Sequence, residues 1–189
     1  MIEIVSEKNQ TYLLSIARQA LEMFVKSRQT IQLNETQLDE EIIQQGATFV
    51  TLHKHGQLRG CIGTLTAYQA IYQDVIEHAI AAGTQDFRFP SMQENELDQL
   101  HYEISILSKP EPLPYSSSED LLNKLQVGVH GVVISSGFQR ATFLPQVWDS
   151  LPQKDEFLNH LCKKMGAAAN AWRKNKYDIS VYQVQEFSE

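Results

Sequence analysis

The stretch Leu58-Arg59-Gly60-Cys61-Ile62-Gly63-Thr64-Leu65 has the apolar residues of a β-strand, but it also contains two glycines. Glycine weakens a strand interior because it has no side chain to pack and loses the most backbone entropy on folding. In a strand it often marks a bulge or a place where another group approaches the backbone closely. The stretch therefore indicates either a tight packing site or a binding site.

The segments around this stretch predict a hairpin, a helix and a strand, in that order. Residues 47–54 and 57–65 read as two strands joined at His55-Gly56, which is a hairpin signal. Residues 68–82 have the apolar spacing of a helix, with Gly83 at the expected C-cap, and residues 9–27 have the same spacing. Residues 101–108 alternate strictly, as a half-buried strand does.

The same order recurs after a connector that contains three prolines. Residues 129–135 and 138–144 read as a second hairpin, 153–164 as a helix and 178–187 as a last strand. This repetition favours a duplicated ββαβ unit and an α+β fold, in which two copies share one antiparallel sheet with flanking helices. The connector also suggests that a single domain, 1–189, is divided into two unequal lobes, 1–109 and 115–189.

The composition limits the class of protein. The chain has 189 residues, 42% of them hydrophobic, and a net charge of −7. An acidic chain has no electrostatic footprint for nucleic acid, which argues against a nucleic-acid partner. Two widely spaced cysteines suit a reducing cytoplasm, and neither a signal peptide nor an apolar run of about 20 residues is present. We therefore expect a cytoplasmic protein that does not insert into membranes.

Cys61 and His130 are the candidate catalytic residues. Strand alternation places Arg59, Cys61 and Gly63 on one face and Leu58 on the other, so the guanidinium and the thiol are expected roughly 7 Å apart along the strand. A nearby cation favours a nucleophilic thiolate, but a free cysteine is commonly a small buried apolar residue. His130, between Gly128 and Gly131, is either an accessible general base or an ordinary hydrogen-bonded histidine. The two residues form a Cys–His pair only if the fold brings them together.

The candidate ligand-binding residues come from separate segments. Asp86 and Arg88, in Asp86-Phe87-Arg88-Phe89-Pro90, form an ion pair within their loop, bind a ligand, or pair elsewhere, for example with Glu103 or a helix end. Gln146 could present an amide to a ligand. Together with Arg59, Gly60 and Gly63, these residues complete the predicted site.

No motif for a metal or a cofactor is present. His53 and His55 are two residues apart beside a hairpin turn, where they are expected to be solvated. The chain lacks HExxH, paired CxxC, a Walker loop, GxGxxG and GxSxG. We therefore predict no metal and no cofactor.

Several motifs, taken in order, resemble the AMMECR-one domain family over roughly residues 10–187. They are Leu58–Thr64, Asp86–Pro90, Glu96-Leu97, Glu103-Ile104-Ser105, Gly128–Val132, Leu144–Val147, and Phe157-Leu158 with Leu161-Cys162, Gly166 and Trp172. The tail at residues 166–172 departs from the family in being rich in alanine. The resemblance implies an α+β protein of two unequal subdomains around antiparallel sheet.

The resemblance implies no established activity. Bacterial and archaeal relatives are often encoded beside, or fused to, Memo-type and radical-SAM proteins, and a role in RNA modification has been suggested for the family. Two functions therefore stay open. The first is a binding protein for a small molecule or for a Memo-type or radical-SAM partner. The second is an enzyme with a site at Cys61, His130 and the arginines, which could act in RNA modification. The sequence does not determine the oligomeric state.

Overall fold

The computed structural model describes residues 4–189, which form two compact units. The larger unit comprises residues 4–107 and Gln185–Glu189, and the inserted unit is Ser108–Val184. Within residues 4–189, no helix is both long enough and apolar enough to cross a membrane. The expected α+β class, with antiparallel strand pairs and flanking helices, is confirmed.

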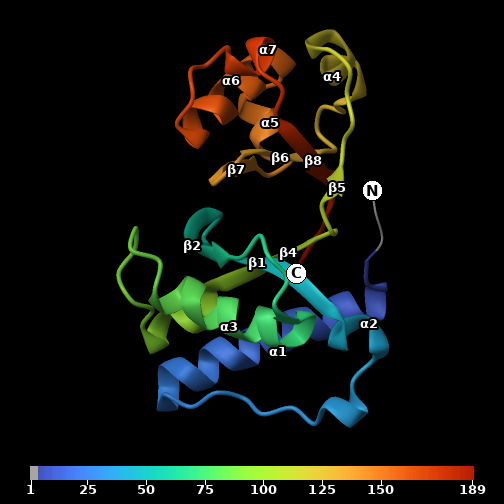
Figure 1. Ribbon diagram of the computed structural model, residues 1–189. Coiled ribbons are helices and arrows are strands. Elements are labelled where there is room, and N and C mark those ends of the chain that lie inside the picture. The colour runs from blue at the N-terminus through green and yellow to red at the C-terminus, as the bar shows by residue number, and fades with distance from the viewer. Residues whose placement is uncertain (1–3) are drawn as a thin grey trace. The chain divides into compact units, whose positions relative to one another are not determined.

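The larger unit places two helices on one face of a five-stranded sheet (Figure 1). Strand order is β2-β1-β4-β9, with β3 also paired to β1. The elements are α1 (Glu7–Ser27), a 3-10 turn (Glu35–Gln37), α2 (Glu40–Ile43), β1 (Gln45–Lys54), β2 (Gln57–Gly63), β3 (Gln69–Ala70), α3 (Ile71–Thr84), a second 3-10 segment (Glu94–Gln99), β4 (Leu100–Leu107) and β9 (Val184–Ser188). Buried side chains of α1, α3, β1 and β4 form one core.

The hairpin expected at His55-Gly56 is confirmed. Both residues have positive φ, 52° and 74°, as a two-residue type I′ turn requires. Glycine takes this conformation without a steric penalty, and His55 is one of the few non-glycine residues that adopt it here. The turn fixes the pairing of β2 with β1, and so it determines where Cys61 lies.

The expected alternation along β2 is wrong because the strand contains a bulge at Arg59. Gly60 pairs with Leu52 and Leu58 pairs with His53, which leaves Arg59 as the extra residue. Leu58 therefore shares a face with Cys61 instead of lying opposite it. A bulge inserts one unpaired residue, and periodicity alone cannot reveal it.

Gly83 was expected to end a helix, but α3 continues to Thr84, and Gln85 is its C-cap. A Cβ at Gly83 would lie 2.5 Å from the Cδ1 atom of Leu21. The glycine therefore allows α3 to pack closely against α1, and it has no role in capping.

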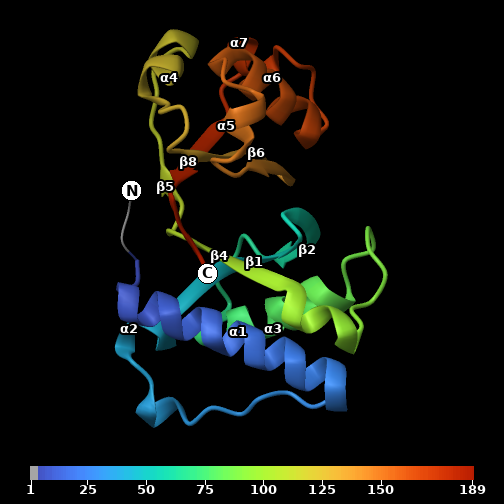
Figure 2. The ribbon, with the colours of Figure 1, turned by 180° about the vertical axis from the view of Figure 1, so that it is seen from behind.

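The inserted unit has its own four-stranded sheet, with strand order β5-β8-β6-β7 (Figure 2). Its core includes the Trp148 and Phe157 rings, which stack with centroids 3.6 Å apart, and the fully buried Cys162. Its elements are β5 (Glu111–Pro112), α4 (Ser118–Lys124), β6 (Gly131–Ser136), β7 (Gln139–Phe143), α5 (Val147–Ser150), α6 (Lys154–Met165), α7 (Ala171–Lys174) and β8 (Asp178–Tyr182).

The repeated order of elements is present, but the single shared sheet is not. In each unit the first hairpin strand pairs with the second and also with the strand after the helix: β1 with β2 and β4, and β6 with β7 and β8. The expected last strand is divided at Gln183, whose N–H donates to Ser108 Oγ and whose carbonyl accepts from the Ser108 N–H. Residues 185–189 thus return to the larger unit instead of staying with the second lobe.

One buried hydroxyl yields a stability prediction. Tyr102 is fully buried, and its hydroxyl has no hydrogen-bond partner among residues 4–189. We expect Tyr102→Phe to raise the free energy of unfolding by about 1 kcal/mol, because an unsatisfied buried polar group is removed. Denaturant unfolding of this variant measures the effect, with Tyr72→Phe as the control at another buried tyrosine. A destabilised Tyr102→Phe protein would contradict the prediction.

Candidate functional site

The loop Asp86–Pro90 binds the free edge of β2 at Cys61. The Asp86 Oδ2 accepts from the Cys61 N–H at 2.9 Å, and the Arg88 Nη2 donates to the Cys61 carbonyl at 3.4 Å. Arg88 also binds Asp86 through Nε (2.9 Å) and Nη2 (2.7 Å), so the expected ion pair within the loop is present, and ligand binding by either residue stays a prediction. The hydrogen bond from Arg88 holds the pKa of the Asp86 carboxyl well below its usual range. The two side chains thus pair with Cys61 as a neighbouring strand would.

Arg59 is held by a different set of partners. Its Nε and Nη2 donate to the two carboxylate oxygens of Glu96 at 3.2 and 3.0 Å, and Nη2 also donates to the Pro90 carbonyl at 2.9 Å. The remaining nitrogen, Nη1, is buried and has no hydrogen-bond partner among residues 4–189. The Arg59 and Arg88 guanidinium carbons lie 5.9 and 5.5 Å from the Phe89 ring centroid. The cation beside Cys61 in this structure is therefore Arg88.

Close packing explains both glycines of the stretch. A Cβ on Gly60 would lie 2.1 Å from the Ala82 carbonyl oxygen of α3, and a Cβ on Gly63 would lie 2.3 Å from the Phe49 ring. No ligand is needed to account for either residue. Their predicted role in ligand binding stays a prediction.

Cys61 shares the sheet face away from the helices with polar neighbours. The Thr51 hydroxyl donates to the Cys61 sulfur at 3.3 Å, and Thr51 pairs in register with Glu103 on β4. Burial, together with the nearby Glu186 carboxylate, raises the pKa of Glu103. Cys61, Thr51 and Glu103 thus form one row across β2, β1 and β4.

His130 and Gln146 belong to the inserted unit. The His130 Nδ1 accepts from the Gln126 N–H at 3.2 Å, and the His130 carbonyl accepts from the Trp148 indole at 2.7 Å. Burial lowers the pKa of the imidazole. Gln146 is exposed and precedes α5. Because Cys61 belongs to the larger unit, a pair between Cys61 and His130 stays a prediction.

A sequence model of the AMMECR1 family matches residues 14–187. The chain belongs to the AMMECR1 family. It is 36% identical to a protein of Methanothermobacter thermautotrophicus over 182 residues, covering 94% of this chain and 92% of the relative. It is 34% identical to a protein of Thermofilum pendens over 192 residues, covering 94% and 88%.

A crystal structure of the uncharacterised protein PH0010 from Pyrococcus horikoshii has a similar fold. The TM-score is 0.85 at 27% identity, over 99% of this chain and 94% of that chain. The AMMECR1 fold is therefore common to this chain and a solved structure of 27% identity.

The two most distinctive AMMECR1 motifs of this chain contact each other directly. Residues 58–63 lie in β2 (Gln57–Gly63), and Asp86–Pro90 is the loop that binds the edge of this strand through Cys61 and Arg59. Within residues 4–189, no group of three or more His, Cys, Asp or Glu side chains is arranged to hold a metal ion. The motifs thus build a hydrogen-bonded edge of a sheet.

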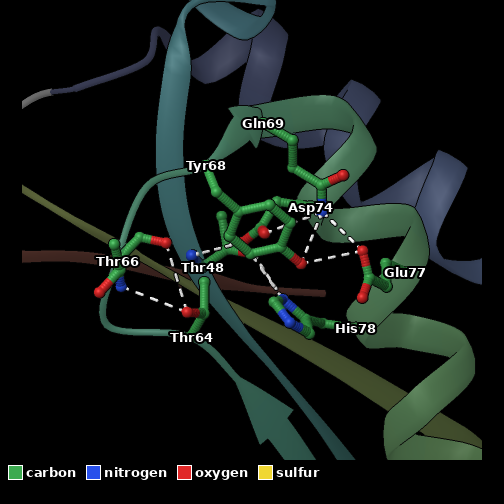
Figure 3. A network of polar contacts seen from close by, with 8 residues as sticks. All are labelled: Thr48, Thr64, Thr66, Tyr68, Gln69, Asp74, Glu77 and His78. Atoms are coloured by element: carbon green, nitrogen blue, oxygen red, sulfur yellow. Dashed lines mark hydrogen bonds and ion pairs between the residues drawn. The ribbon is translucent and has the colours of Figure 1, made fainter.

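A buried polar network around Asp74 was not predicted from the sequence (Figure 3). The fully buried Asp74 accepts from the Thr48 N–H and hydroxyl, both at 2.7 Å, and from the Gln69 amide at 3.1 Å, and its Oδ2 lies 3.2 Å from the His78 Nδ1. Thr48 needs this acceptor because β2 ends beside it, where the Thr64 N–H donates to the Thr48 carbonyl. The available signal was the spacing of four between Asp74 and His78 on one helix face.

Glu96, which binds Arg59, and Asp86, which binds Arg88, are expected to make the fold less stable in acid. The hydrogen bond from Arg59 lowers the pKa of Glu96 to about 2, and the pKa of Asp86 is also depressed. A carboxylate with a depressed pKa stabilises the fold above its unfolded pKa of about 4, and this contribution is lost as pH falls through the folded pKa.

We therefore expect the stability difference between wild type and Glu96→Gln to shrink as pH falls from about 5 to about 2. Denaturant unfolding at several pH values measures it. Glu94→Gln, at an exposed neighbouring carboxylate, is the control and should differ little from wild type at any of these values. A pH-independent effect of Glu96→Gln would contradict the assignment.

Proposed function

We propose that this protein is a binding module that docks a Memo-type or radical-SAM protein in the cytoplasm through the loop Asp86–Pro90. One observation carries the proposal: Phe87 is 96% exposed, although the residues on both sides of it are hydrogen bonded. A large apolar side chain held outside the core is typical of an interaction site. Aromatic and arginine side chains supply much of the binding energy in protein interfaces.

The loop supports this role because its conformation is set before a partner arrives. The Arg88 N–H donates to Asp86 Oδ1, and the Phe89 N–H donates to the Asp86 carbonyl, so the chain turns tightly around Phe87. Asp86 is buried, whereas the Arg88 side chain is 46% exposed next to Phe87. A preformed loop loses little entropy on binding, which favours affinity.

The test uses the purified full-length protein and Memo-type and radical-SAM proteins from the same organism. Calorimetry should give a dissociation constant for one of these proteins that rises at least about tenfold in Phe87→Ala, as expected for an anchor residue. The fold should keep its stability within about 0.5 kcal/mol, because Phe87 is exposed.

Phe138→Ala is the matched control, since Phe138 is an equally exposed phenylalanine in the inserted unit. It should bind as wild type does. An equal loss of affinity in Phe87→Ala and Phe138→Ala would contradict the proposal. So would a wild-type protein that binds neither a Memo-type nor a radical-SAM protein.

An enzymatic role is the second candidate, and the row formed by Cys61, Thr51 and Glu103 favours it. A thiol, a hydroxyl that donates to it, and a carboxyl with a raised pKa are groups that covalent and acid–base catalysis uses. The His130 Nδ1 accepts a hydrogen bond from the Gln126 N–H, so the neutral imidazole carries its proton on Nε2. Neither ring nitrogen is then free to take a proton, which argues against His130 as the base. The net charge of −7 lends no support to RNA as the substrate.

Thiol labelling separates the two roles. A catalytic Cys61 should react with iodoacetamide at neutral pH faster than a simple thiol does, whereas the fully buried Cys162 provides an unreactive internal control. Labelling of Cys61 no faster than a simple thiol would rule against the enzymatic role and leave the binding role standing.

A further inference from the structure

His130 is fixed from three sides within the inserted unit. Its N–H donates to the Gln126 carbonyl at 3.0 Å, its Nδ1 accepts from the Gln126 N–H, and its carbonyl accepts from the Trp148 indole. The flanking glycine Gly131 lets the Tyr182 ring pack against the backbone, because a Cβ there would lie 2.4 Å from that ring. These contacts hold the imidazole in one orientation.

The free nitrogen of this imidazole is a hydrogen-bond donor. A backbone N–H occupies Nδ1, so in the neutral ring the proton is on Nε2. His130 is only 9% exposed, and its Nε2 has no partner among residues 4–189. His130 lines a cavity, so a donor without a protein partner is available there to an acceptor on a bound molecule.

His130 lines a cavity of about 280 Å³, and two residues of opposite charge line it as well. Lys109 and Glu111 line it, together with Ser108, Val181, Tyr182 and Gln183. In the part of the chain that the structure describes, the side chains of Lys109 and Glu111 have no ion-pair or hydrogen-bond partner. The cavity is smaller than those that hold drug-sized ligands. It therefore suits a small molecule that carries both charges.

We propose that this cavity binds a small zwitterion, an α-amino acid or a molecule with the same two groups. The His130 Nε2–H and the Lys109 ammonium bind the ligand's carboxylate, and the Glu111 carboxylate binds its ammonium group. Charge-assisted hydrogen bonds of this kind are shorter and stronger than neutral ones. The proposal is independent of the docking role of Phe87, which lies in the larger unit.

The experiment titrates the full-length protein with alanine, with acetate and with ethylamine, and follows the His130 side chain by long-range ¹H–¹⁵N NMR. Alanine should bind more tightly than acetate, which lacks the ammonium, and than ethylamine, which lacks the carboxylate. The spectrum should show the Nε2–H tautomer before and after binding. Equal responses to all three probes, or no saturable response to alanine, would overturn the proposal.

Variants assign the contacts to individual groups. His130→Phe keeps a planar ring but loses the donor, and it should weaken alanine binding at least about tenfold, as loss of a hydrogen bond to a charged group does. His130→Gln restores a side-chain N–H and should recover part of this loss. Glu111→Gln should reduce alanine binding toward that of acetate. Wild-type affinity in His130→Phe would refute the assignment even if alanine binds.

Discussion

Replacing Asp74 with alanine is expected to lower the free energy of unfolding by about 3–5 kcal/mol, as breaking a buried charged network does. The carboxylate is fully buried, accepts from Thr48 and Gln69, and lies 3.2 Å from the His78 Nδ1. Without it, the Thr48 N–H at the end of the β1–β2 pairing has no acceptor, and an unsatisfied buried donor is itself destabilising. Denaturant unfolding followed by circular dichroism measures the effect.

The matched control is Glu77→Ala, one turn from Asp74 on the same helix. Glu77 is exposed, but it also accepts from Gln69, at 2.7 Å, and from the Tyr68 hydroxyl at 2.9 Å. Its loss should cost less than about 1 kcal/mol, because water replaces the lost partner. Comparable losses in the two variants would show that burial of the Asp74 network contributes nothing.

Gly60→Ala should destabilise the larger unit by about 3 kcal/mol or more, an effect at the upper end of overpacking. The new Cβ would lie 2.1 Å from the Ala82 carbonyl oxygen. A helix backbone cannot rotate away as a side chain can, so α3 must shift relative to β2. Thermal and denaturant unfolding of the variant both report this change.

Gly56→Ala, in the turn of the same hairpin, separates steric overlap from backbone strain. Gly56 has a φ of +74°, and nothing lies within 4 Å of a Cβ placed there. The left-handed conformation alone should cost about 1–2 kcal/mol. If Gly60→Ala is no worse than Gly56→Ala, the close approach of α3 to β2 is not important for stability.

The local pattern of the sequence predicted the hairpin, the long helices and a loop at Asp86–Pro90, but not that this loop binds β2. His55-Gly56 specifies its turn by conformation, and the apolar spacing of α1 and α3 follows from one buried face. The Asp86–Arg88 pair was one of three alternatives from sequence, because two residues of opposite charge two positions apart have many compatible partners.

The rest depends on contacts between distant residues. A bulge at Arg59 moves Leu58 to the Cys61 face, and no property of residues 58–61 alone requires it. The partners of Arg59 and Asp74, which are Glu96 and Thr48, lie 37 and 26 residues away. His130 was recognised from its glycines, but its tautomer depends on a local turn that brings the Gln126 N–H to its Nδ1, four residues away, and the residue types alone did not reveal this turn.

The return of residues 185–189 to the larger unit has a consequence for synthesis on the ribosome. Gln185 binds the backbone of Ile4 and Val5, so these two residues have to wait for a partner that is translated 180 residues after Val5. The inserted unit is continuous from Ser108 to Val184 and has its own core. Since domains generally fold as units during translation, the inserted unit can reach its native state before the larger unit does.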